Sequence, residues 1–519
     1  MRCPGLLVLS LICFLFAHIS PLLLAESSCV IRTNKLSAVS DAQRPRARFA
    51  PAVTYDTGGL YALGVAVGDL NGDGTPDLVV VNASQNGGSS KDGVVGVLLG
   101  NGDGTFQNAV AYDSGGIGTN SVAIGDVNGD GYLDVVVANI DSNSVSVLLG
   151  KGDGTFQAPV SYNAGPEPYL YSLADLRSNG RLDIVVSNEP NPYVVSVLLG
   201  NGDGTFQTPL GYSGCPQVFS LTIGDVNGDR LPDLVVTVPD TVGVALGNGD
   251  GTFQAMAYYS SGGQIPEAIA IGDLNGDGYP DLAVANQCTF YCPRDDYEGP
   301  VGVLLGNGDG TFRPPVLYGS HGHFSDSIAI ADMNGDGYPD LVVANECQKV
   351  DPSADCIGPP EIAVLLNIGN GTFPYHSDFV TGNGEDYEAA IGDLNLDGRP
   401  DLVGVNWNAF GNGPSTAGVL LNTLTYKTST ALTSSPNPAQ VHQPVIFTAT
   451  ITASQAIPDG QVVSFYSGKT KIGAGTTRNG VATLTTSFSR ARTYAIKASY
   501  EGEGFLKASS GTVKQVVNP

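Results

Sequence analysis

The sequence is poor in basic residues, histidine, methionine and tryptophan. Its 519 residues include 24 lysine and arginine residues against 50 aspartate and glutamate residues, with 5 histidines, 3 methionines and a single tryptophan. The resulting formal net charge of -26 repels other polyanions, so we expect neither nucleic acid nor an anionic lipid surface as a partner. With so few histidines, few positions in the chain could act as an imidazole acid, base or metal ligand.

Long apolar runs are confined to the start of the sequence. Residues 1–25, MRCPGLLVLSLICFLFAHISPLLLA, combine one early arginine, an apolar run and a small residue at Ala25, which predicts a cleaved secretory signal. A retained membrane anchor is the alternative, because the run approaches spanning length, although His18 and Pro21 interrupt it. We therefore expect a secreted, extracellular or cell-surface protein without a membrane span after cleavage, and a linker over 26–47.

The chain also lacks the short motifs of common catalytic sites. It has no G-x-S-x-G, no zinc-protease H-E-x-x-H and no phosphate-binding loop. His321 and His323 could place two imidazoles on one side of a strand, but such a pair is more often solvated than metal-binding. We therefore predict a protein that is not an enzyme and has no catalytic residues.

Cysteine is scarce, and its spacing suggests local disulfides. Two of the eight cysteines lie in the predicted signal, and export would allow the remaining six to form disulfides. The pairs close in sequence, which we predict to be bonded, are Cys288 with Cys292 and Cys347 with Cys356. The pairing of Cys29 and Cys215 stays open. The spacing in CTFYC also resembles a metal site, but no second cluster accompanies it.

The sequence is rich in glycine, with 69 residues, and contains a repeated acidic segment. The segment GDLNGDGYPDLAVAN at residue 272 places aspartate, asparagine and glycine in one turn and then becomes apolar. Seven copies occur about 48 to 61 residues apart, a spacing close to that of propeller repeats. The other copies are GDLNGDGTPDLVVVN at 68, GDVNGDGYLDVVVAN at 125, ADLRSNGRLDIVVSN at 174, GDVNGDRLPDLVVTV at 224, ADMNGDGYPDLVVAN at 331 and GDLNLDGRPDLVGVN at 392.

A second signature after each acidic segment completes a unit of four strands. It reads VLLGNGDGTFQNAVAY at residue 97 and recurs, with changes, at 147, 197, 244, 303 and 364. Each unit predicts strand A before the acidic loop, strand B after it, strand C at VGVLLG and strand D after the NGDG turn, as in a propeller blade. Asn-Gly and Asp-Gly are hairpin signals in their own right. Their aspartates could still add charge near the acidic loops: Asp103, Asp153, Asp203, Asp250 and Asp309.

The seventh unit stops after its strand C. TLTYKTST follows AGVLLN at the place where GDGTF is expected. Residues 49–55, FAPAVTY, match the strand D pattern and precede the first strand A. The sequence therefore predicts an all-β fold with a seven-bladed β-propeller over 48–423, closed by the N-terminal strand so that no open edge remains.

Each acidic loop presents oxygen ligands at alternate positions. In the first copy Asp69, Asn71 and Asp73 stand at positions 1, 3 and 5, followed by the carbonyl of Thr75 at 7 and by Asp77 at 9. This spacing, with glycine at the bend, suits Ca²⁺, whereas Mg²⁺ prefers a stricter octahedron. Without a cation, three crowded carboxylates would raise one another's pKa. A metal-free Asx turn is the alternative for a single loop, but copies in register favour about six structural calcium ions.

Five further loops carry the same ligand pattern. Their predicted metal ligands are Asp126, Asn128, Asp130, Tyr132 and Asp134; Asp225, Asn227, Asp229, Leu231 and Asp233; Asp273, Asn275, Asp277, Tyr279 and Asp281; Asp332, Asn334, Asp336, Tyr338 and Asp340; and Asp393, Asn395, Asp397, Arg399 and Asp401. Arg230 stands where glycine eases the bend, at a cost of about 1 kcal/mol if the backbone there is left-handed. Leu396, at position 4 of the last loop, is expected to be a lesser change.

The loop at residue 175 departs from the pattern. Arg177 stands at position 3 and Asn179 at position 5, which leaves Asp175 and Asp183 as its only acids. We predict weak or absent metal binding there, with the guanidinium of Arg177 in place of the cation.

A different pattern begins after residue 423. Segments such as VIFTATITA, VATLTTSF and TYAIKASY alternate apolar and polar residues at strand length, separated by turn residues. About seven such strands predict a β-sandwich over 424–519. It has neither cysteine nor tryptophan, so it lacks the core pair of antibody domains.

The acidic loops and the GNGDGTF turns resemble the FG-GAP family, also described as VCBS repeats, the calcium-binding propeller of integrin α-subunit heads and of many bacterial exported proteins. The resemblance covers roughly residues 48–423 and implies a seven-bladed propeller with Ca²⁺ in the A–B loops. Residues 425–519, with SPNPAQVHQPVIFTATI and YAIKASYEGEG, are similar to bacterial Ig-like domains, which implies a spacer or adhesive module.

The favoured function is a non-catalytic scaffold for adhesion to an extracellular protein or glycan ligand. The B–C loops lie on the face opposite the acidic loops and carry aromatic residues typical of a binding platform. These residues are Phe290, Tyr291, Tyr297, Trp407 and Phe410. Loops that pack on themselves are the alternative. A lyase-like enzyme active on polysaccharides and a passive structural surface protein also stay open, as does the oligomeric state.

Overall fold

A computed structural model describes most of the chain from residue 46 onward. The described residues are 46–85, 92–188, 194–212, 217–288, 298–347, 349–350, 356–357, 359–382, 385–407 and 415–519. The predicted signal, most of the linker, Cys29, Cys215 and Cys292 lie outside them. Residues 45–519 form one compact unit. In the described part, the one short 3-10 helix is η2 (Ile140–Ser142), and no helix is long and apolar enough to cross a membrane.

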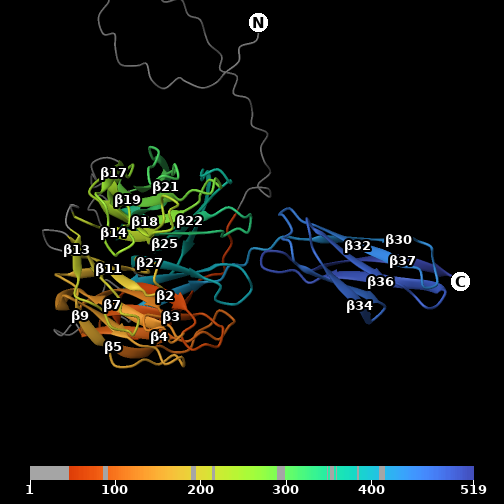
Figure 1. Ribbon diagram of the computed structural model, residues 1–519, viewed down its shortest axis with the longest axis horizontal. Coiled ribbons are helices and arrows are strands. Elements are labelled where there is room, and N and C mark those ends of the chain that lie inside the picture. The colour runs from red at the N-terminus through yellow and green to blue at the C-terminus, as the bar shows by residue number, and fades with distance from the viewer. Residues whose placement is uncertain are drawn as a thin grey trace, which may run out of the picture. The chain divides into compact units, whose positions relative to one another are not determined.

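The first four blades are separate four-stranded antiparallel sheets. Each runs in sequence order from an inner strand A to an outer strand D (Figure 1). Their strands are β2 (Leu60–Gly68), β3 (Asp77–Ser84), β4 (Asp92–Leu98) and β5 (Val110–Ile117); β6 (Thr119–Gly125), β7 (Asp134–Asn139), β8 (Ser144–Leu148) and β9 (Val160–Asn163); β10 (Pro168–Ala174), β11 (Asp183–Asn188), β12 (Val194–Leu198) and β13 (Leu210–Tyr212); β14 (Ser220–Gly224), β15 (Asp233–Val238), β16 (Thr241–Ala245) and β17 (Ala257–Ser260).

Blades 5 and 6 share one long strand, so their strands belong to a single sheet. The 16-residue β21 (Val316–Ala331) is strand D of blade 5 in its first half and strand A of blade 6 in its second half. The other strands are β18 (Gln264–Gly272), β19 (Asp281–Cys288), β20 (Glu298–Leu304), β22 (Asp340–Cys347), β25 (Glu361–Leu366) and β26 (Tyr375–Val380). A separate ribbon follows β22, made of β23 (Lys349–Val350) and β24 (Cys356–Ile357).

Blade 7 takes its outer strand from the N-terminal side of the propeller. Its sheet has the order β1-β29-β28-β27, and β1 pairs antiparallel with β29, with Val53 opposite Val419. The strands are β1 (Val53–Asp56), β27 (Glu385–Gly392), β28 (Asp401–Trp407) and β29 (Thr416–Leu420). Because inner strand β2 packs against both β27 and β28, blades 1 and 7 are neighbours and the ring is closed.

The hydrophobic core lies between the blades rather than within any one of them. Strand B is buried on both faces; Leu78, Val79, Val80 and Val81 are each 0% exposed, which explains its unbroken run of β-branched residues. Between blades 7 and 1, for example, Val403 and Val405 pack in one cluster with Leu78 and Val80. Similar clusters fill the other inter-blade contacts.

The inner strands of most blades carry a β-bulge at nearly the same place. The pairing register shifts between Ala62 and Gly64 in blade 1 and between Asp386 and Glu388 in blade 7, with counterparts in blades 2, 3, 5 and 6. Bulges re-aim the side chain that follows them. After the bulge of β27, the carboxylate of Glu388 accepts a hydrogen bond from the Val65 N–H at 3.0 Å.

The C-terminal residues form an Ig-like β-sandwich. One sheet has the order β30-β32-β35 and the other β31-β37-β36-β33-β34, and its core includes Phe447, Phe465 and Tyr500. The strands are β30 (Ser429–Ser435), β31 (Ala439–Gln440), β32 (Val445–Thr452), β33 (Val462–Ser467), β34 (Thr470–Thr476), β35 (Val481–Thr486), β36 (Arg492–Tyr500) and β37 (Ser509–Asn518).

Candidate metal centres

The A–B loops fold around their first aspartate. In blade 1 the Asp69 carboxylate accepts hydrogen bonds from the Gly72 N–H at 2.7 Å and the Gly74 N–H at 2.8 Å. Asn71 and Asp73 each accept from the N–H two residues later, at 2.9 and 2.8 Å. These bonds hold the side chains of positions 1, 3 and 5 in one turn, at the alternate positions expected of oxygen ligands. The equivalent bonds recur in blades 2, 4, 5 and 6.

The turn needs a left-handed backbone at positions 4 and 6. In blade 1 Gly72 has a φ of 73° and Gly74 a φ of 84°. Arg230, at position 6 in blade 4, has a φ of 70°, so the condition attached to its predicted cost is met. Leu396, at position 4 in blade 7, has a φ of 57°. The expectation that Leu396 is the lesser change is therefore wrong, because both positions require the same strained backbone.

The aspartate at position 9 is buried and joins two loops of its blade. Asp77 is 0% exposed and accepts from the Leu70 N–H at 2.9 Å and the Gly100 N–H at 2.7 Å. Gly100 belongs to the C–D turn, so this carboxylate ties that turn to the A–B loop. Its counterparts accept from the C–D side in the same way: Asp134 from Gly150, Asp183 from Gly200, Asp233 from Gly247, Asp281 from Gly306, Asp340 from Asn367 and Asp401 from Asn422. The sequence did not reveal this second role.

Burial and neighbouring carboxylates raise the pKa of Asp77, Asp340 and Asp401 at position 9. Burial raises the pKa of Asp77, and the charges of Asp73 and Asp69 raise it further. The same causes raise the pKa of Asp340 to about 8 and that of Asp401 to about 7. Two or three negative charges in one loop therefore oppose each other unless a cation lies among them.

The loop of blade 3 contains its own cation. Arg177 Nη2 donates to Oδ1 of the buried Asp183 at 2.6 Å and to the Gly200 carbonyl at 2.6 Å, while Nε lies 3.3 Å from Asp183 Oδ2. The guanidinium therefore contacts the closing carboxylate in a two-pronged geometry. Asp175 and Asn179 keep their places in the turn, bonded to the N–H groups of Gly180 and Arg181.

The loop of blade 7 also contains a guanidinium, which the sequence pattern did not predict. Arg399 was expected to offer its carbonyl at position 7, but its side chain turns back and Nη2 donates to Asp397 Oδ2. Its Nε donates to the Asn422 carbonyl at 2.8 Å and its Nη1 to the Gly504 carbonyl at 2.8 Å. Asp393 still accepts from the N–H groups of Asp397 and Gly398.

The donor set of the remaining loops fits a hard cation. Each offers three carboxylates, one amide oxygen and one backbone carbonyl, all oxygen ligands of the kind Ca²⁺ takes. Within the described ranges, no three histidine, cysteine, aspartate or glutamate side chains gather into a ready metal cluster. The residues at position 7 differ between blades: Tyr132, Tyr279 and Tyr338 are 44 to 48% exposed. A Cβ on Gly152 would lie 2.3 Å from the Tyr132 ring, so this tyrosine covers the C–D turn.

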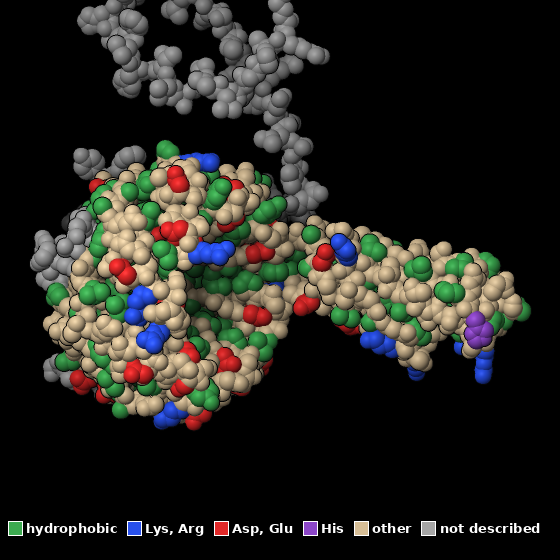
Figure 2. Space-filling view, in the orientation of Figure 1, with side chains coloured by type: hydrophobic (Ala, Val, Ile, Leu, Met, Phe, Trp, Pro, Cys, Tyr) green, Lys and Arg blue, Asp and Glu red, His purple; other side chains and the backbone are tan. Residues whose placement is uncertain are grey.

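The C–D turns behave as hairpin signals. Asp103 accepts from both the N–H and the hydroxyl of Thr105, at 3.0 and 2.5 Å, and these bonds lower the pKa of its exposed carboxyl group. The counterparts Asp153, Asp203, Asp250 and Asp309 make the same pair of bonds. Figure 2 shows acidic side chains dispersed over the visible face of the propeller rather than gathered in one patch.

Of the predicted aromatic platform, the described residues include Trp407 alone. Phe290, Tyr291, Tyr297 and Phe410 lie outside them. Trp407 is partly buried at the end of β28, and its ring meets that of Tyr61 edge to face, with centroids 5.8 Å apart. The ring of Trp407 therefore contributes to the contact between blades 7 and 1.

The cysteines and histidines give a mixed outcome. Cys288 is disulfide-bonded, whereas its predicted partner Cys292 and the side chains of Cys347 and Cys356 lie outside what is described. The ring of His321 stacks on that of His376, with centroids 3.3 Å apart.

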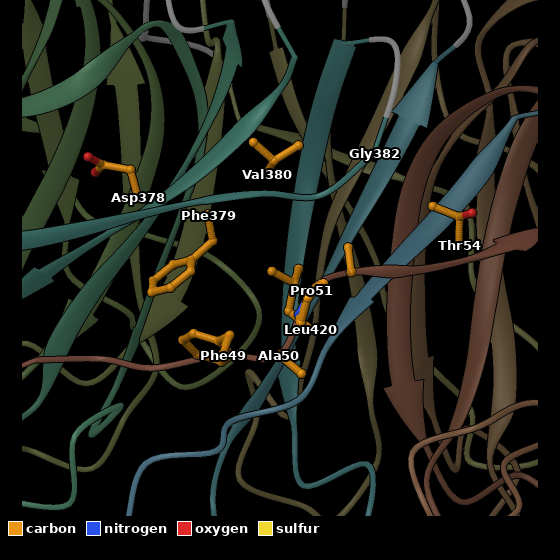
Figure 3. Close-up of a pocket in the computed structure, with 10 residues that line it drawn as sticks. Phe49, Ala50, Pro51, Thr54, Asp378, Phe379, Val380, Gly382 and Leu420 are labelled. Carbon is orange, nitrogen blue, oxygen red and sulfur yellow. The ribbon is translucent and has the colours of Figure 1, made fainter.

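A shallow groove lies between the outer strands of blades 6 and 7. It has a volume of about 540 Å³ and is lined by Phe49, Pro51, Phe379, Val380 and Leu420, among others (Figure 3). Phe49 and Phe379 meet edge to face with centroids 4.7 Å apart. The groove is mainly apolar and lies where the N-terminal strand joins blade 7.

Comparison with solved structures gives distant similarities. An Agrocybe aegerita lectin that recognises non-reducing terminal N-acetylglucosamine is 20% identical, with a TM-score of 0.43, over 64% of this chain and 90% of the lectin. The V. cholerae biofilm matrix protein Bap1 is 13% identical, with a TM-score of 0.34, over 92% of each chain. An ancestral GH74 enzyme is 12% identical, with a TM-score of 0.42, over 91% of this chain and 63% of the enzyme. No curated protein sequence matches the chain.

Family profiles give a closer assignment. The bacterial Ig-like domain of group 3 matches residues 432–518. The FG-GAP-like repeat matches residues 69–137, 126–186, 175–236, 225–284 and 290–343, which together cover more than half of the chain. The first four matches begin at the first aspartate of an A–B loop, the fifth begins at residue 290, and all five end in strand B of a following blade. The chain thus belongs to the FG-GAP-like repeat family and carries a bacterial Ig-like domain after its propeller.

Proposed function

We propose that this protein is an extracellular binding scaffold whose propeller is stabilised by calcium ions in its A–B loops. The observation that carries the proposal is the recurrence of one hydrogen-bonded turn around Asp69 and its counterparts, with carboxylate and amide side chains at alternate positions. Ca²⁺ accepts flexible sets of oxygen ligands of this kind. A bound divalent ion would turn repulsion between the carboxylates into attraction.

The loops do not support this role equally. The blade 3 loop holds the guanidinium of Arg177 against Asp183, and the blade 7 loop holds that of Arg399 against Asp397. A guanidinium in contact with a ligand carboxylate competes with a divalent ion for the same charge. We therefore place calcium in the loops of blades 1, 2, 4, 5 and 6, about five ions instead of six.

The ligand of the scaffold is proposed to be an extracellular protein or glycan. Support comes from the acidic composition, which disfavours polyanions as partners, and from the absence of catalytic motifs in the sequence. At the end of the propeller opposite the acidic loops, Trp407 and Tyr61 place two aromatic rings together, with Tyr61 36% exposed. Aromatic rings with one exposed face are frequent anchors for protein and sugar ligands.

Protein and glycan arrays probed with the full chain test the binding role. We expect a ligand whose binding is weakened at least tenfold by Trp407→Ala and is unchanged by Tyr258→Ala, an exposed tyrosine on outer strand β17. A chain that binds nothing on either array would contradict the scaffold and favour a passive structural role. Turnover of an acidic polysaccharide would contradict it in another way and favour a lyase-like enzyme.

A further inference from the structure

The Ig-like domain contacts the A–B loop of blade 6 through Tyr426. The Tyr426 hydroxyl donates to the Asn334 carbonyl at 2.9 Å, and Asn334 occupies position 3 of that loop. The backbone of Tyr426 is paired with the Ig-like domain: its N–H donates to the Phe505 carbonyl at 2.6 Å, and its carbonyl accepts from the Lys507 N–H at 2.9 Å. One tyrosine therefore connects the acidic loop to the turn at 503–507.

Phe505 covers the same loop. A Cβ on Gly335, at position 4, would lie 2.2 Å from the Phe505 ring, so the ring rests directly on this glycine. Blade 2 has the same ligand residues with no such cover, and there Gly129 and Asp130 are exposed. In blade 6 Asn334 is 1% exposed, and Gly335 and Asp336 are partly buried. Two loops of matching chemistry thus differ in whether the Ig-like domain covers them.

The neighbouring loop of blade 7 meets the same turn through a permanent cation. Arg399 Nη2 donates to Asp397 of the loop, and Arg399 Nη1 donates to the Gly504 carbonyl of the Ig-like domain at 2.8 Å. The backbones approach closely, because a Cβ on Gly398 would lie 3.2 Å from the Gly504 Cα. This half of the junction carries its own positive charge.

The blade 6 half of the junction lacks such a charge. A cavity of about 470 Å³ lies between the loop and the Ig-like domain, lined by Asp332 and Asp336 from one side and Glu503 from the other, together with Gln455 and Gln461. Carboxylates from both sides repel each other across this space unless a cation neutralises the loop. The backbone that Tyr426 and Phe505 contact is also the backbone that would surround a cation bound in this loop.

We propose that the cation in the blade 6 loop fastens the Ig-like domain to the propeller, which makes the junction sensitive to calcium on this side and permanent on the Arg399 side. This inference rests on the calcium binding proposed above. The ion orders the Asn334 and Gly335 backbone and removes the repulsion by Glu503. Without it, the turn at 503–507 separates from the loop while Arg399 still tethers it.

Hydrogen exchange in the full chain measures this directly. The N–H groups of Tyr426 and Lys507 are protected by the pairing that abuts the loop, so exchange in segments 424–428 and 503–507 reports local opening. We expect exchange in both segments to quicken about tenfold when calcium is replaced by EGTA. Strand β32 (Val445–Thr452), inside the Ig-like core, serves as the internal reference and should not change. Equal exchange in calcium and EGTA would overturn the proposal.

A pair of matched variants separates this inference from calcium binding itself. Asp332→Asn/Asp336→Asn alters blade 6, and Asp126→Asn/Asp130→Asn makes the same change in the uncovered loop of blade 2. Each is expected to lose one ion by native mass spectrometry. Only the blade 6 variant should show fast exchange at 424–428 in calcium. Loss of one ion in each variant with identical exchange would overturn the junction while leaving calcium binding intact, and a wild-type chain without any ion would defeat both.

Tyr426→Phe gives a test that leaves every ligand in place. It removes the hydroxyl that donates to Asn334, so we expect an unchanged ion count but faster exchange at 424–428 in calcium. Tyr494→Phe is the control, because the Tyr494 hydroxyl donates to the Arg490 carbonyl within the Ig-like domain. Equal exchange in the two variants would overturn the proposal even if the aspartate variants fail to fold.

Discussion

Arg177 donates to Asp183 at 2.6 Å across a loop whose six counterparts have asparagine in the place of this arginine. Asp183 is 0% exposed, and a buried carboxylate without a partner destabilises the fold strongly. The same Nη2 also donates to the Gly200 carbonyl. The chain thus shows, within one molecule, a covalently attached cation at the position where the other loops are proposed to hold a metal ion.

Exchanging that cation for ligands should create a calcium site. The variant Arg177→Asn/Asn179→Asp restores the ligand pattern of blade 2, so native mass spectrometry should count one more calcium ion than in the wild type. In EGTA the variant should be destabilised by about 3 kcal/mol, because Asp183 loses its guanidinium, and calcium should restore the melting temperature. Arg181→Asn, at position 7 of the same loop, is the control. An unchanged ion count would contradict the assignment of Arg177.

Relief of the left-handed strain should stabilise the propeller. Arg230 and Leu396 have φ values of 70° and 57°, which cost an L-residue about 1–2 kcal/mol. Part of the gain is offset by the larger unfolded-state freedom of glycine. We expect Arg230→Gly and Leu396→Gly each to raise the unfolding free energy by about 0.5–1 kcal/mol, measured by urea denaturation.

The control for this experiment is Arg181→Gly. Arg181 lies in the corresponding loop of blade 3 and does not have a positive φ, so glycine there brings the entropic cost without the relief. Destabilisation by Arg230→Gly or Leu396→Gly of the same size as that by Arg181→Gly would show that these positions are not strained.

Partly buried Glu388 should make stability depend on pH. Burial raises the pKa of Glu388 from 4.5 to about 7, although the hydrogen bond from the Val65 N–H acts in the other direction and lowers this pKa. Because the folded pKa lies above the unfolded value, the unfolded chain releases this proton first, and stability is lost as pH rises from about 4.5 through 7. Glu388→Gln should flatten the melting temperature in this window, whereas Glu501→Gln, an exposed change, should not. Parallel pH curves for wild type and Glu388→Gln would refute this role.

The closing aspartates should matter for stability even without metal. Asp134 accepts from the N–H groups of Val127 and Gly150 with separate oxygens, and asparagine has one oxygen for these two donors. A buried donor left unpaired costs about 1–3 kcal/mol, so Asp134→Asn should lower the melting temperature in EGTA. Asp153→Asn, in the exposed C–D turn, is the matched change and should have a much smaller effect. Equal losses would mean that the buried link is not important.

Much of this fold could be predicted because the same strand and turn patterns recur in the sequence of each blade. The unbroken apolar run of strand B, the turn glycines and the strand D pattern of residues 49–55 are local signals. The strand D pattern predicted that this segment completes the last blade, and Val53 is found paired with Val419. The sequence could not show that strand D of blade 5 continues into strand A of blade 6 as β21, because SHGHF between them reads as a loop.

The finer parts of the site depend on contacts between distant segments. Position 4 of the turn is glycine in five loops. Because glycine adopts a positive φ without strain, the sequence did not show that Leu396 at this position has a left-handed backbone. The guanidinium of Arg399 is directed by Gly504, more than one hundred residues away in sequence, and no local pattern reports such a partner. Trp407 was predicted from the sequence as part of a binding platform, whereas its contact with Tyr61 could not be predicted because the two residues lie far apart in the sequence.

Calcium stoichiometry, measured on the full chain by native mass spectrometry together with the melting temperature before and after EGTA, tests the central claim most directly. The account predicts about five retained ions, their loss in EGTA and a large fall in melting temperature, because the crowded carboxylates of Asp69, Asp73 and their counterparts then face one another uncompensated. A protein that carries no divalent ion and melts at the same temperature in EGTA would contradict it.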